Sequence, residues 1–488
     1  MNLPESFLDS MRGMLSAGEF LELCGAYERP SVRGLRVNLL KIGGCTAGIF
    51  GGGFADLSLT PVPWCKTGFI YDSGINDKGA ADFISKKSQS PAKSVDYHAG
   101  LFYIQEPSAM CPAEALDVQR GHRVLDLCAA PGGKSVQIAG HLQGEGLLVS
   151  NDSSPSRCRA LVKNLERAGV TNALVLTEQP MNLGRFSGFF DRILVDAPCS
   201  GEGMFRREPD AIKAYTSNKP EACAAVQKEI LRHAAKLLKP DGKMVYSTCT
   251  FNTTENEDVI ADFLEKHGDF SLVEIGNSVT DCVGVRNGRG GLSRAVRIFP
   301  HEKGEGHFVA LLSRGASPLF SDCSVDVLRT TQNINLVGIS PRSLDISRTR
   351  EKFPEFTAFC DEFLNLDFPT HGEFVKNGDC LYFQAVPLDL RGLRVARSGW
   401  YLGDCLKGRF VPSQALAMGL RKEQARFSVE LSEAESQKYL RGESWLVGGE
   451  YSGKPWILVC HKGFPLGWAR IVQQRLKNNL PVGWAVKH

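Results

Sequence analysis

The central part of the chain alternates short apolar runs with segments whose apolar residues recur at helical spacing. These patterns predict strands at residues 123–127, 146–151, 174–177, 190–196 and 243–249, and helices at residues 134–142, 155–168 and 226–239. Two later runs, residues 296–299 and 307–312, are joined by HEKGEG and predict an antiparallel edge hairpin. Such alternation is typical of an α/β fold with a doubly wound, mostly parallel sheet.

The pattern changes on both sides of this core, which we place at residues 96–315. Residues 1–95 predict a small α/β module. Its expected elements are an amphipathic helix at residues 4–23 and strands at residues 34–41, 56–59 and 69–71. Residues 318–400 are mixed and weakly periodic, and residues 401–488 carry short strand-like runs between glycines. A chain of 488 residues is longer than one hydrophobic core usually supports, which agrees with several modules.

The first strand of the core leads into a loop of small residues, in the stretch GHRVLDLCAAPGGKS at residues 121–135. Its glycines allow backbone N–H groups to approach a ligand closely, which predicts a cofactor site. A phosphate-binding P-loop would need glycine at Cys128, and the dinucleotide pattern G-x-G-x-x-G is missing. The next strand ends at Asp152, where an acid reaches ribose hydroxyls in such folds. This combination favours S-adenosylmethionine.

Two cysteines follow strands directly, Cys199 in APCSGEG and Cys249 in TCT. Ligands of such a sheet bind beyond the carboxyl ends of the strands, and successive strands usually lie side by side. Both thiols are therefore expected at one cleft. A cysteine in a strand is more often a small core residue, but these two lie at strand ends and Cys199 has proline and glycine beside it.

A pair of thiols suits methyl transfer to carbon five of cytosine, which is too weak a nucleophile on its own. Addition of a thiolate to carbon six makes carbon five enamine-like, so that it attacks a sulfonium methyl group. The proton on carbon five must then leave before the thiol is eliminated, with a second thiol or a water as base. Asp196 is placed to bond the N3 and amine edge of the base, or else it only caps its loop. The residues around Cys249 also fit a strand end followed by a helix cap.

The charge of the chain bears on whether its partner is a nucleic acid. The net charge of +3 is too small to argue for nucleic acid, so local patches must carry that argument. The end of the chain has cations and aromatics without acids: Lys462, Phe464, Trp468, Arg470, Arg475, Lys477, Trp484 and Lys487. They suit either an RNA-gripping surface or a solvated basic face over a tryptophan core.

The 15 cysteines form no C-x-x-C pair and no zinc-type spacing, so no metal site is expected. The first residues lack the apolar core of a signal peptide, and no run is long enough to span a membrane. Free thiols in a reducing cytoplasm are the expected state.

The stretches LDLCAAPGGKS, ILVDAPCSGEGMFRR and YSTCTFNTTENED resemble the signatures of the Sun-domain RNA 5-methylcytosine methyltransferases. GLRVNLLK, AGLFYIQEPSAM and HKGFPLGWARIVQQRLKNNLP extend the resemblance to the RsmF type, which modifies 16S ribosomal RNA; residues 318–400 match least. The resemblance implies a Rossmann-like methyltransferase core, an RNA-binding N-terminal module, and α+β and PUA-like RNA-binding modules behind it. It also implies a monomer that acts on 16S rRNA, with the 30S subunit as the expected partner.

The resemblance also implies roles for individual residues. Cys249 would attack carbon six, and Cys199 would assist proton removal or product release. Contacts to S-adenosylmethionine would come from Cys128, Ala129, Ala130, Pro131, Gly132, Gly133, Lys134, Asp152, Arg157, Gln179 and Asp196. Within this set the loop would hold the methionine part, Asp152 the ribose, and Asp196 would lie between cofactor and cytosine.

Two points of this assignment stay open. The family often has an aspartate near the adenine, where this chain offers Glu178 or Gln179. Lys134 could orient a carboxylate instead of acting in catalysis.

Other classes of protein share parts of this pattern. DNA cytosine methyltransferases use the Pro-Cys thiol alone, so the additional Cys249 favours RNA. The remaining alternatives are a tRNA 5-methylcytosine methyltransferase and a ribosome assembly factor without turnover.

Overall fold

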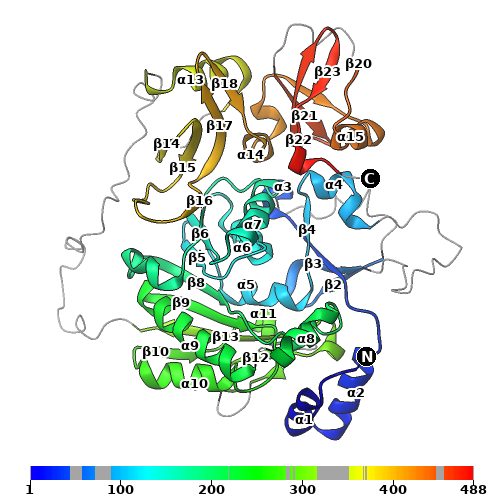
Figure 1. The fold of residues 1–488 in the computed structure, drawn as a ribbon, viewed down its shortest axis with the longest axis vertical. Coiled ribbons are helices and arrows are strands. Elements are labelled where there is room, and N and C mark those ends of the chain that lie inside the picture. Colours follow the sequence, from blue (N-terminus) through cyan, green and yellow to red (C-terminus); the bar gives the residue numbers. More distant parts are fainter. Residues whose placement is uncertain are drawn as a thin grey trace, which may run out of the picture.

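The computed structural model describes residues 2–43, 58–71, 90–217, 219–281, 286–288, 292–315, 351–366, 368, 371–446 and 456–486. A large mixed sheet with its helices forms the middle of the molecule (Figure 1). The N-terminal helices lie at one end, and two β-rich modules from the C-terminal part lie at the other (Figure 1).

The central sheet has ten strands in the described ranges and follows the order β11-β12-β13-β9-β8-β5-β6-β7-β16, with β10 also paired to β13. Its five parallel strands are β5 (Arg123–Asp126), β6 (Leu147–Asn151), β7 (Ala173–Leu176), β8 (Phe190–Asp196) and β9 (Leu238–Thr248). The other strands are β10 (Phe270–Val273), β11 (Arg286–Asn287), β12 (Val296–Ile298), β13 (His307–Arg314) and β16 (Val395–Arg397). The Rossmann-like core is confirmed: its five central strands are parallel, and the predicted antiparallel hairpin β12–β13 joins them beside β9, so the whole sheet is mixed.

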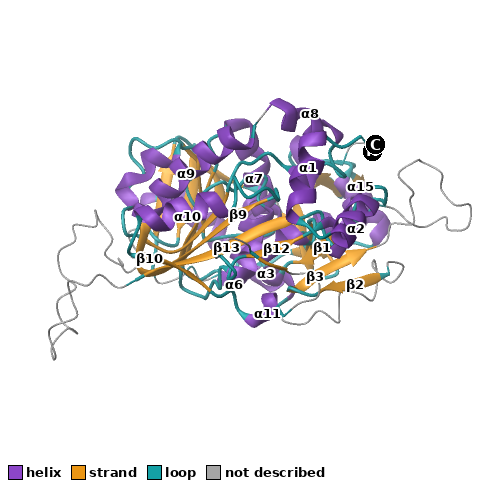
Figure 2. Ribbon diagram, turned by 90° about the horizontal axis from the view of Figure 1, so that it is seen from below, coloured by secondary structure: helices purple, strands orange, loops and turns teal. Residues whose placement is uncertain are grey.

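Helices cover both faces of this sheet because side chains along each strand alternate between two cores. Val124 and Leu148 pack into one core, whereas Leu125 and Val149 pack into the other. The helices of the first face include α5 (Cys111–Ala115), α6 (Gly133–Leu142), α7 (Pro155–Arg167) and α11 (Asn277–Thr280). Those of the second face are α9 (Pro220–Leu237) and α10 (Glu257–Lys266), which Figure 2 shows across the strands from α6. The short α8 (Pro209–Ser217) lies outside both sets.

The N-terminal segment forms two helices, so the prediction of one helix at residues 4–23 was wrong. α1 (Glu5–Met14) ends because Leu15 is extended, and α2 (Ala17–Tyr27) begins with a capping box between Ser16 and Glu19. Residues of both helices belong to one hydrophobic cluster with Phe205 and Phe251, which follow Cys199 and Cys249 in the chain. The helix pair therefore packs against the segments that follow the two cysteines.

A four-stranded sheet, ordered β2-β3-β1-β4, joins the helix pair to the core. Its strands are β1 (Gly34–Val37), β2 (Leu59–Val62), β3 (Cys65–Tyr71) and β4 (Phe102–Ile104). The strand predicted at residues 34–41 was too long, because the Asn38 side chain accepts a hydrogen bond from the Leu40 amide and begins α3 (Leu39–Ile42). Residues 56 and 57 of the strand predicted at residues 56–59 lie outside the described residues, and β2 begins at the last residue of this range, Leu59. The short α4 (Val95–His98) precedes β4.

The C-terminal part contains two further sheets, ordered β14-β15-β17-β18 and β19-β21-β22-β23-β20. The elements of the first are α13 (Pro354–Phe363), β14 (Glu373–Asn377), β15 (Cys380–Gln384), β17 (Trp400–Leu406), β18 (Arg409–Pro412) and α14 (Gln414–Gly419). Those of the second are β19 (Ser428–Glu430), α15 (Glu433–Leu440), β20 (Trp445–Leu446), β21 (Ile457–His461), β22 (Phe464–Val472) and β23 (Arg475–Asn478).

The aromatic and basic residues at the end of the chain divide into two groups. Trp468 is 2% exposed, and its indole N–H donates to the Ser413 carbonyl at 2.9 Å, so base stacking on this ring is excluded. Arg475 and Lys477 lie on β23, where their side chains are exposed. Lys487 lies outside the described residues. The tryptophan core and the basic face are thus both present, on different residues.

The strand β16 brings a distant part of the chain into the central sheet. It pairs antiparallel with β7, with Val395 opposite Leu176, and the Thr177 amide donates to the Arg394 carbonyl at 2.8 Å. The Arg397 side chain is buried and donates to the Val170 carbonyl at 3.0 Å. The strand therefore closes the β7 edge, which would otherwise expose unpaired backbone groups.

Among the helices of the described ranges, none has the length and hydropathy that a membrane crossing requires.

Candidate active site

The small-residue loop after β5 lies between the ends of β5 and β6 and the start of α6. The Ala129 amide donates to the Asn151 carbonyl at 2.8 Å, and the Ala130 amide to Asp152 Oδ2 at 3.2 Å. Gly132 has a φ of 110°, and a Cβ there would lie 3.0 Å from Leu161, so a side chain would be strained. The glycine turn thus directs the chain into α6 over a tightly packed floor.

The first turn of α6 has no side-chain cap, so the amide groups there are available to a ligand. The loop carbonyls, in contrast, are held from outside: Arg157 donates to Ala130 O at 2.5 Å, Asn164 to Pro131 O at 2.8 Å, and Arg36 to Gly133 O at 2.8 Å. The positive end of a helix dipole favours a carboxylate or phosphate. This end of α6 therefore suits an anionic ligand group.

The expected ribose acid lies at the tip of β6. Asp152 is 3% exposed; its Oδ1 accepts from the Ser154 amide at 3.0 Å, and its Oδ2 lies 3.2 Å from Arg157 Nη1. Arg157 therefore contacts both the loop and this acid. The Asp152 carboxylate and the backbone of the loop therefore lie together at the carboxyl end of the strands.

The two candidates for the adenine contact lie in different surroundings. Glu178 is buried; its Oε1 accepts from the Arg394 amide at 2.7 Å and its Oε2 from Asn182 at 2.8 Å. The carboxylate is thus turned toward the segment that precedes β16. Gln179 is exposed at the same strand end, and its contact with adenine stays a prediction.

Asp126 ends β5 beneath the loop, and its pKa yields a prediction about stability. Burial raises the pKa to about 7, although the Ser135 hydroxyl donates to Oδ2 at 2.6 Å and opposes part of the shift. A carboxyl whose pKa is higher in the folded state binds a proton on folding. The free energy of unfolding therefore falls as pH rises from about 4 to about 7.

We expect Asp126→Asn to remove most of this loss, on the order of 2 to 4 kcal/mol between pH 4.5 and pH 8. Denaturant unfolding of the wild type and the variant across this range measures the difference. Asp210→Asn, at an exposed position, is the matched control. An unchanged pH dependence in Asp126→Asn would contradict the assignment.

The tip of β8 places Asp196 among three polar side chains. Lys134 Nζ lies 2.7 Å from Oδ2, Ser247 donates to Oδ1 at 2.8 Å, and His307 Nε2 lies 3.7 Å from Oδ1. Burial alone would raise the pKa of Asp196, but Lys134 and His307 outweigh it and hold the pKa well below its usual range. Asp196 is therefore an anion at neutral pH and forms an ion pair with Lys134. The role of Lys134 stays a prediction.

The two cysteines meet at the ends of neighbouring parallel strands. β8 and β9 pair with Asp196 opposite Ser247, and Cys199 Sγ lies 3.3 Å from Cys249 Sγ, with both residues partly exposed. The hydrogen bond with Cys249 and burial both raise the pKa of Cys199, so this thiol keeps its proton at neutral pH. Burial also raises the pKa of the Cys128 thiol, which lies in the small-residue loop.

Several residues of the site were not predicted. His307 comes from β13, and its Nδ1 lies 3.3 Å from Ser108 Oγ, which donates to Glu106 Oε2 at 2.5 Å. Glu202 and Glu255 are fully buried and contact the segments of both cysteines. The sequence showed these acids as a loop residue and a helix-cap residue, and nothing in the local pattern revealed what each one contacts.

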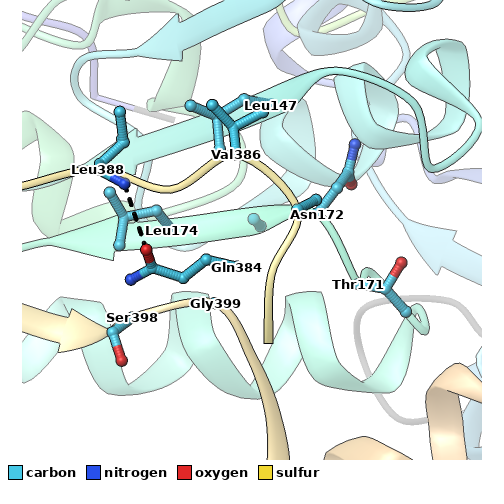
Figure 3. A pocket seen from close by; sticks show the side chains of 11 residues that line it. Leu147, Thr171, Asn172, Leu174, Gln384, Val386, Leu388, Ser398 and Gly399 are labelled. Atoms are coloured by element: carbon cyan, nitrogen blue, oxygen red, sulfur yellow. Dashed lines mark hydrogen bonds between the residues drawn. The ribbon is translucent and has the colours of Figure 1, made fainter. Parts of the chain in front are cut away.

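A small pocket lies away from this site, between the amino ends of β6 and β7 and the segment around β15 and β16 (Figure 3). Leu147, Leu174 and Val386 are among its lining residues, and Gln384 accepts a hydrogen bond from the Leu388 amide at 3.3 Å. None of its lining residues is ionisable or a cysteine. The chemistry-bearing groups therefore lie at the other, carboxyl end of the strands, where ligands of such sheets bind.

Family models match four consecutive parts of the chain. "N-terminal domain of 16S rRNA methyltransferase RsmF" matches residues 3–107, and "16S rRNA methyltransferase RsmB/F" matches residues 113–313. "RsmF rRNA methyltransferase first C-terminal domain" matches residues 358–420, and "Methyltransferase RsmF PUA domain" matches residues 426–486.

Curated relatives match over the whole length. A ribosomal RNA small subunit methyltransferase F from Vibrio cholerae serotype O1 is 31% identical over 491 residues, which cover 99% of this chain and 97% of that protein. The protein of the same name from Shewanella loihica is also 31% identical, with coverage of 98% and 94%.

Solved structures agree with the fold. A methyltransferase homolog protein from Pyrococcus horikoshii is 29% identical with a TM-score of 0.50, over 64% of this chain and all of that one. NSun6 from Pyrococcus horikoshii with SFG has a TM-score of 0.54 at 21% identity, over 64% of this chain and 99% of that one, and shows the fold alone. With the full-length matches and the four domain models, the chain belongs to the RsmF family of 16S rRNA methyltransferases.

Proposed function

We propose that this chain, an S-adenosylmethionine-dependent rRNA methyltransferase, forms 5-methylcytosine in 16S rRNA. The observation that carries the proposal is the 3.3 Å separation of Cys199 Sγ and Cys249 Sγ beside the Asp196 carboxylate. Methylation of carbon five needs a nucleophile, an acid or base, and a polar group for the base edge. These groups lie together at the tips of β8 and β9.

Cys249 is the nucleophile of the proposed reaction. Its thiolate adds to carbon six of cytosine, which makes carbon five electron-rich. Cys199, which keeps its proton, stands 3.3 Å from the attacking sulfur and does not compete with it. After the methyl group has moved to carbon five, the proton on that carbon is removed and Cys249 leaves carbon six, which restores the ring.

In this proposal, Asp196 and Lys134 interact with the cytosine base itself. As an anion, Asp196 accepts a hydrogen bond from the exocyclic amine of cytosine. The Lys134 ammonium, 2.7 Å from that carboxylate, stabilises negative charge that develops on the ring after thiolate addition. Once Cys249 is bonded to carbon six, its hydrogen bond and charge no longer raise the pKa of Cys199. Cys199 then loses its proton to water, accepts the proton of carbon five as a thiolate, and so assists release of the methylated base.

S-adenosylmethionine supplies an electrophilic methyl group on its sulfonium sulfur. The chain's residues fit it: the uncapped amides of α6 suit the methionine carboxylate, and the buried Asp152 suits the ribose hydroxyls. Gln179 remains the proposed adenine contact, because Glu178 is engaged with Arg394 and Asn182.

In this proposal, catalysis and RNA binding are carried out by different modules of the chain. Residues 96–315 carry the catalysis, and residues 1–95 and 401–488 bind RNA, with residues 318–400 between them. The match of residues 426–486 to an RsmF PUA domain and the exposed cations of β23 support RNA binding at this end. The proposed substrate is 16S rRNA, with the 30S subunit as the partner.

Purified protein with methyl-labelled S-adenosylmethionine tests the function on naked 16S rRNA, on 30S subunits and on tRNA. We expect label in the small-subunit RNA, and bisulfite sequencing is expected to place it on carbon five of cytosine. Label confined to tRNA would assign the alternative substrate. Absence of label from every RNA would favour the assembly factor.

A further inference from the structure

Two buried glutamates connect the segments that carry the cysteines. Glu202 follows Cys199 by three residues, but its Oε2 accepts from the amides of Phe251 and Asn252 at 2.5 and 3.0 Å. Its Oε1 accepts from the Asn252 side chain at 3.1 Å. The carboxylate of the Cys199 segment therefore holds the backbone just after Cys249.

Glu255 makes the opposite connection. It follows Cys249 by six residues, but its Oε2 accepts from the Ser200 amide at 2.9 Å and its Oε1 from the Ser200 hydroxyl at 2.5 Å. Gln227 donates to Oε2 at 2.9 Å, and Asn252 donates to Oε1 at 2.8 Å. The carboxylate that follows Cys249 thus holds the backbone just after Cys199.

Both carboxylates are completely buried, and hydrogen-bond donors surround them. Burial of such groups is costly unless they are fully hydrogen-bonded, and bonds to an ionised acceptor are about twice as strong as neutral ones. A glutamine in either position keeps the shape of the side chain. However, its amide group would place a second donor against the existing donors, so at least one hydrogen bond would be lost.

We propose that Glu202 and Glu255 form a reciprocal clamp, in which Glu202 positions Cys249 and Glu255 positions Cys199. The inference rests on the proposed function, in which the two thiols act in different steps. Each glutamate is a positioning residue for the cysteine of the opposite segment. Loss of either one therefore affects a different half of the reaction.

The two substitutions have distinguishable consequences. In Glu255→Gln, the Cys199 segment loosens while Glu202 still holds the Cys249 segment, so addition to RNA proceeds and release is slow. In Glu202→Gln, the Cys249 segment loosens, so addition itself is slow and no adduct accumulates. A displacement near 1 Å changes such steps by on the order of 100-fold, and we expect effects of about 10- to 100-fold.

Single-turnover reactions with 16S rRNA, stopped in detergent and resolved on a denaturing gel, measure adduct and methyl transfer separately. Glu255→Gln is expected to accumulate at least about 10-fold more adduct than wild type, with methyl transfer into the adduct preserved. Glu202→Gln is expected to form adduct at least about 10-fold more slowly. Glu114→Gln, on a carboxylate of α5 that accepts from Gln137 at 2.8 Å, controls for a general loss of packing.

A second readout does not depend on activity. A bifunctional thiol reagent such as dibromobimane joins the sulfurs of Cys199 and Cys249 in the free protein, and mass spectrometry of peptides identifies the link. The rate of this reaction is expected to fall at least about 10-fold in both glutamine variants but not in Glu114→Gln.

The two readouts separate the clamp from the function. Unchanged cross-linking in both variants, or equal effects of both on adduct formation and release, would overturn the clamp. If the wild type methylates no RNA while cross-linking still responds to both glutamates, the proposed function fails and the clamp stands.

Discussion

Cys249→Ala is expected to lower methyl transfer to 16S rRNA by at least about 1,000-fold, because carbon five remains unreactive without a thiolate on carbon six. Cofactor binding is expected to survive. The Cys249 sulfur contacts Cys199, whereas the cofactor loop is held by Asn151, Asp152 and Arg157. Labelled methyl transfer and calorimetric titration with S-adenosylmethionine measure the two properties.

Cys380→Ala is the control for this experiment, because Cys380 is a partly exposed cysteine of β15, in a different sheet. Its transfer rate is expected to match that of the wild type. Retained transfer in Cys249→Ala would exclude Cys249 as the nucleophile. An adduct formed by that variant through Cys199 would reverse the two roles.

Cys199→Ala is expected to trap the RNA on the protein. Addition by Cys249 and methyl transfer do not need the second thiol, but release does in the proposed sequence of steps. The adduct appears as a band of reduced mobility on a denaturing gel, and we expect it to hold most of the enzyme after one turnover. Turnover is expected to fall at least about 100-fold.

The double variant Cys199→Ala/Cys249→Ala is the control for the trapped species, since it lacks the attacking sulfur. It is expected to show no band. A Cys199→Ala protein that turns over normally, without adduct, would remove Cys199 from the release step. Water would then be the base that takes the proton from carbon five.

The local pattern was sufficient to predict the central sheet and the meeting of the two cysteines. Apolar runs followed by Cys199 and Cys249 placed both at strand ends, and the pairing of β8 with β9 brings their sulfurs together. The parallel topology of the five central strands follows from the same alternation. The roles of these residues in the reaction stay a prediction until the variants are measured.

What the pattern did not reveal has a physical reason in each case. The break between α1 and α2 was signalled by Ser16 and Glu19, whose spacing fits a capping box, but the apolar spacing across it suggested one helix. Trp468 lies on β22, which is buried along most of its length, so alternation cannot tell which aromatics face solvent.

The contacts of Glu202, Glu255 and His307 are long-range. Glu202 meets residues about fifty positions later, and His307 approaches Asp196 from a strand more than a hundred positions away. Such contacts depend on how strands are ordered in the sheet, which a single sequence constrains only through the position of each strand. The three-residue β16 is too short to show any periodicity.

The position of β16 has a consequence for fragments of this protein. A polypeptide that stops at residue 315 contains every residue assigned to chemistry. However, β7 would keep β6 and lose β16 on its other side, and Glu178 would lose the Arg394 amide that it binds. The exposed border would then be free to pair with a second molecule. A stable catalytic fragment therefore has to include residues 394–397, either in the same polypeptide or added back as a separate peptide.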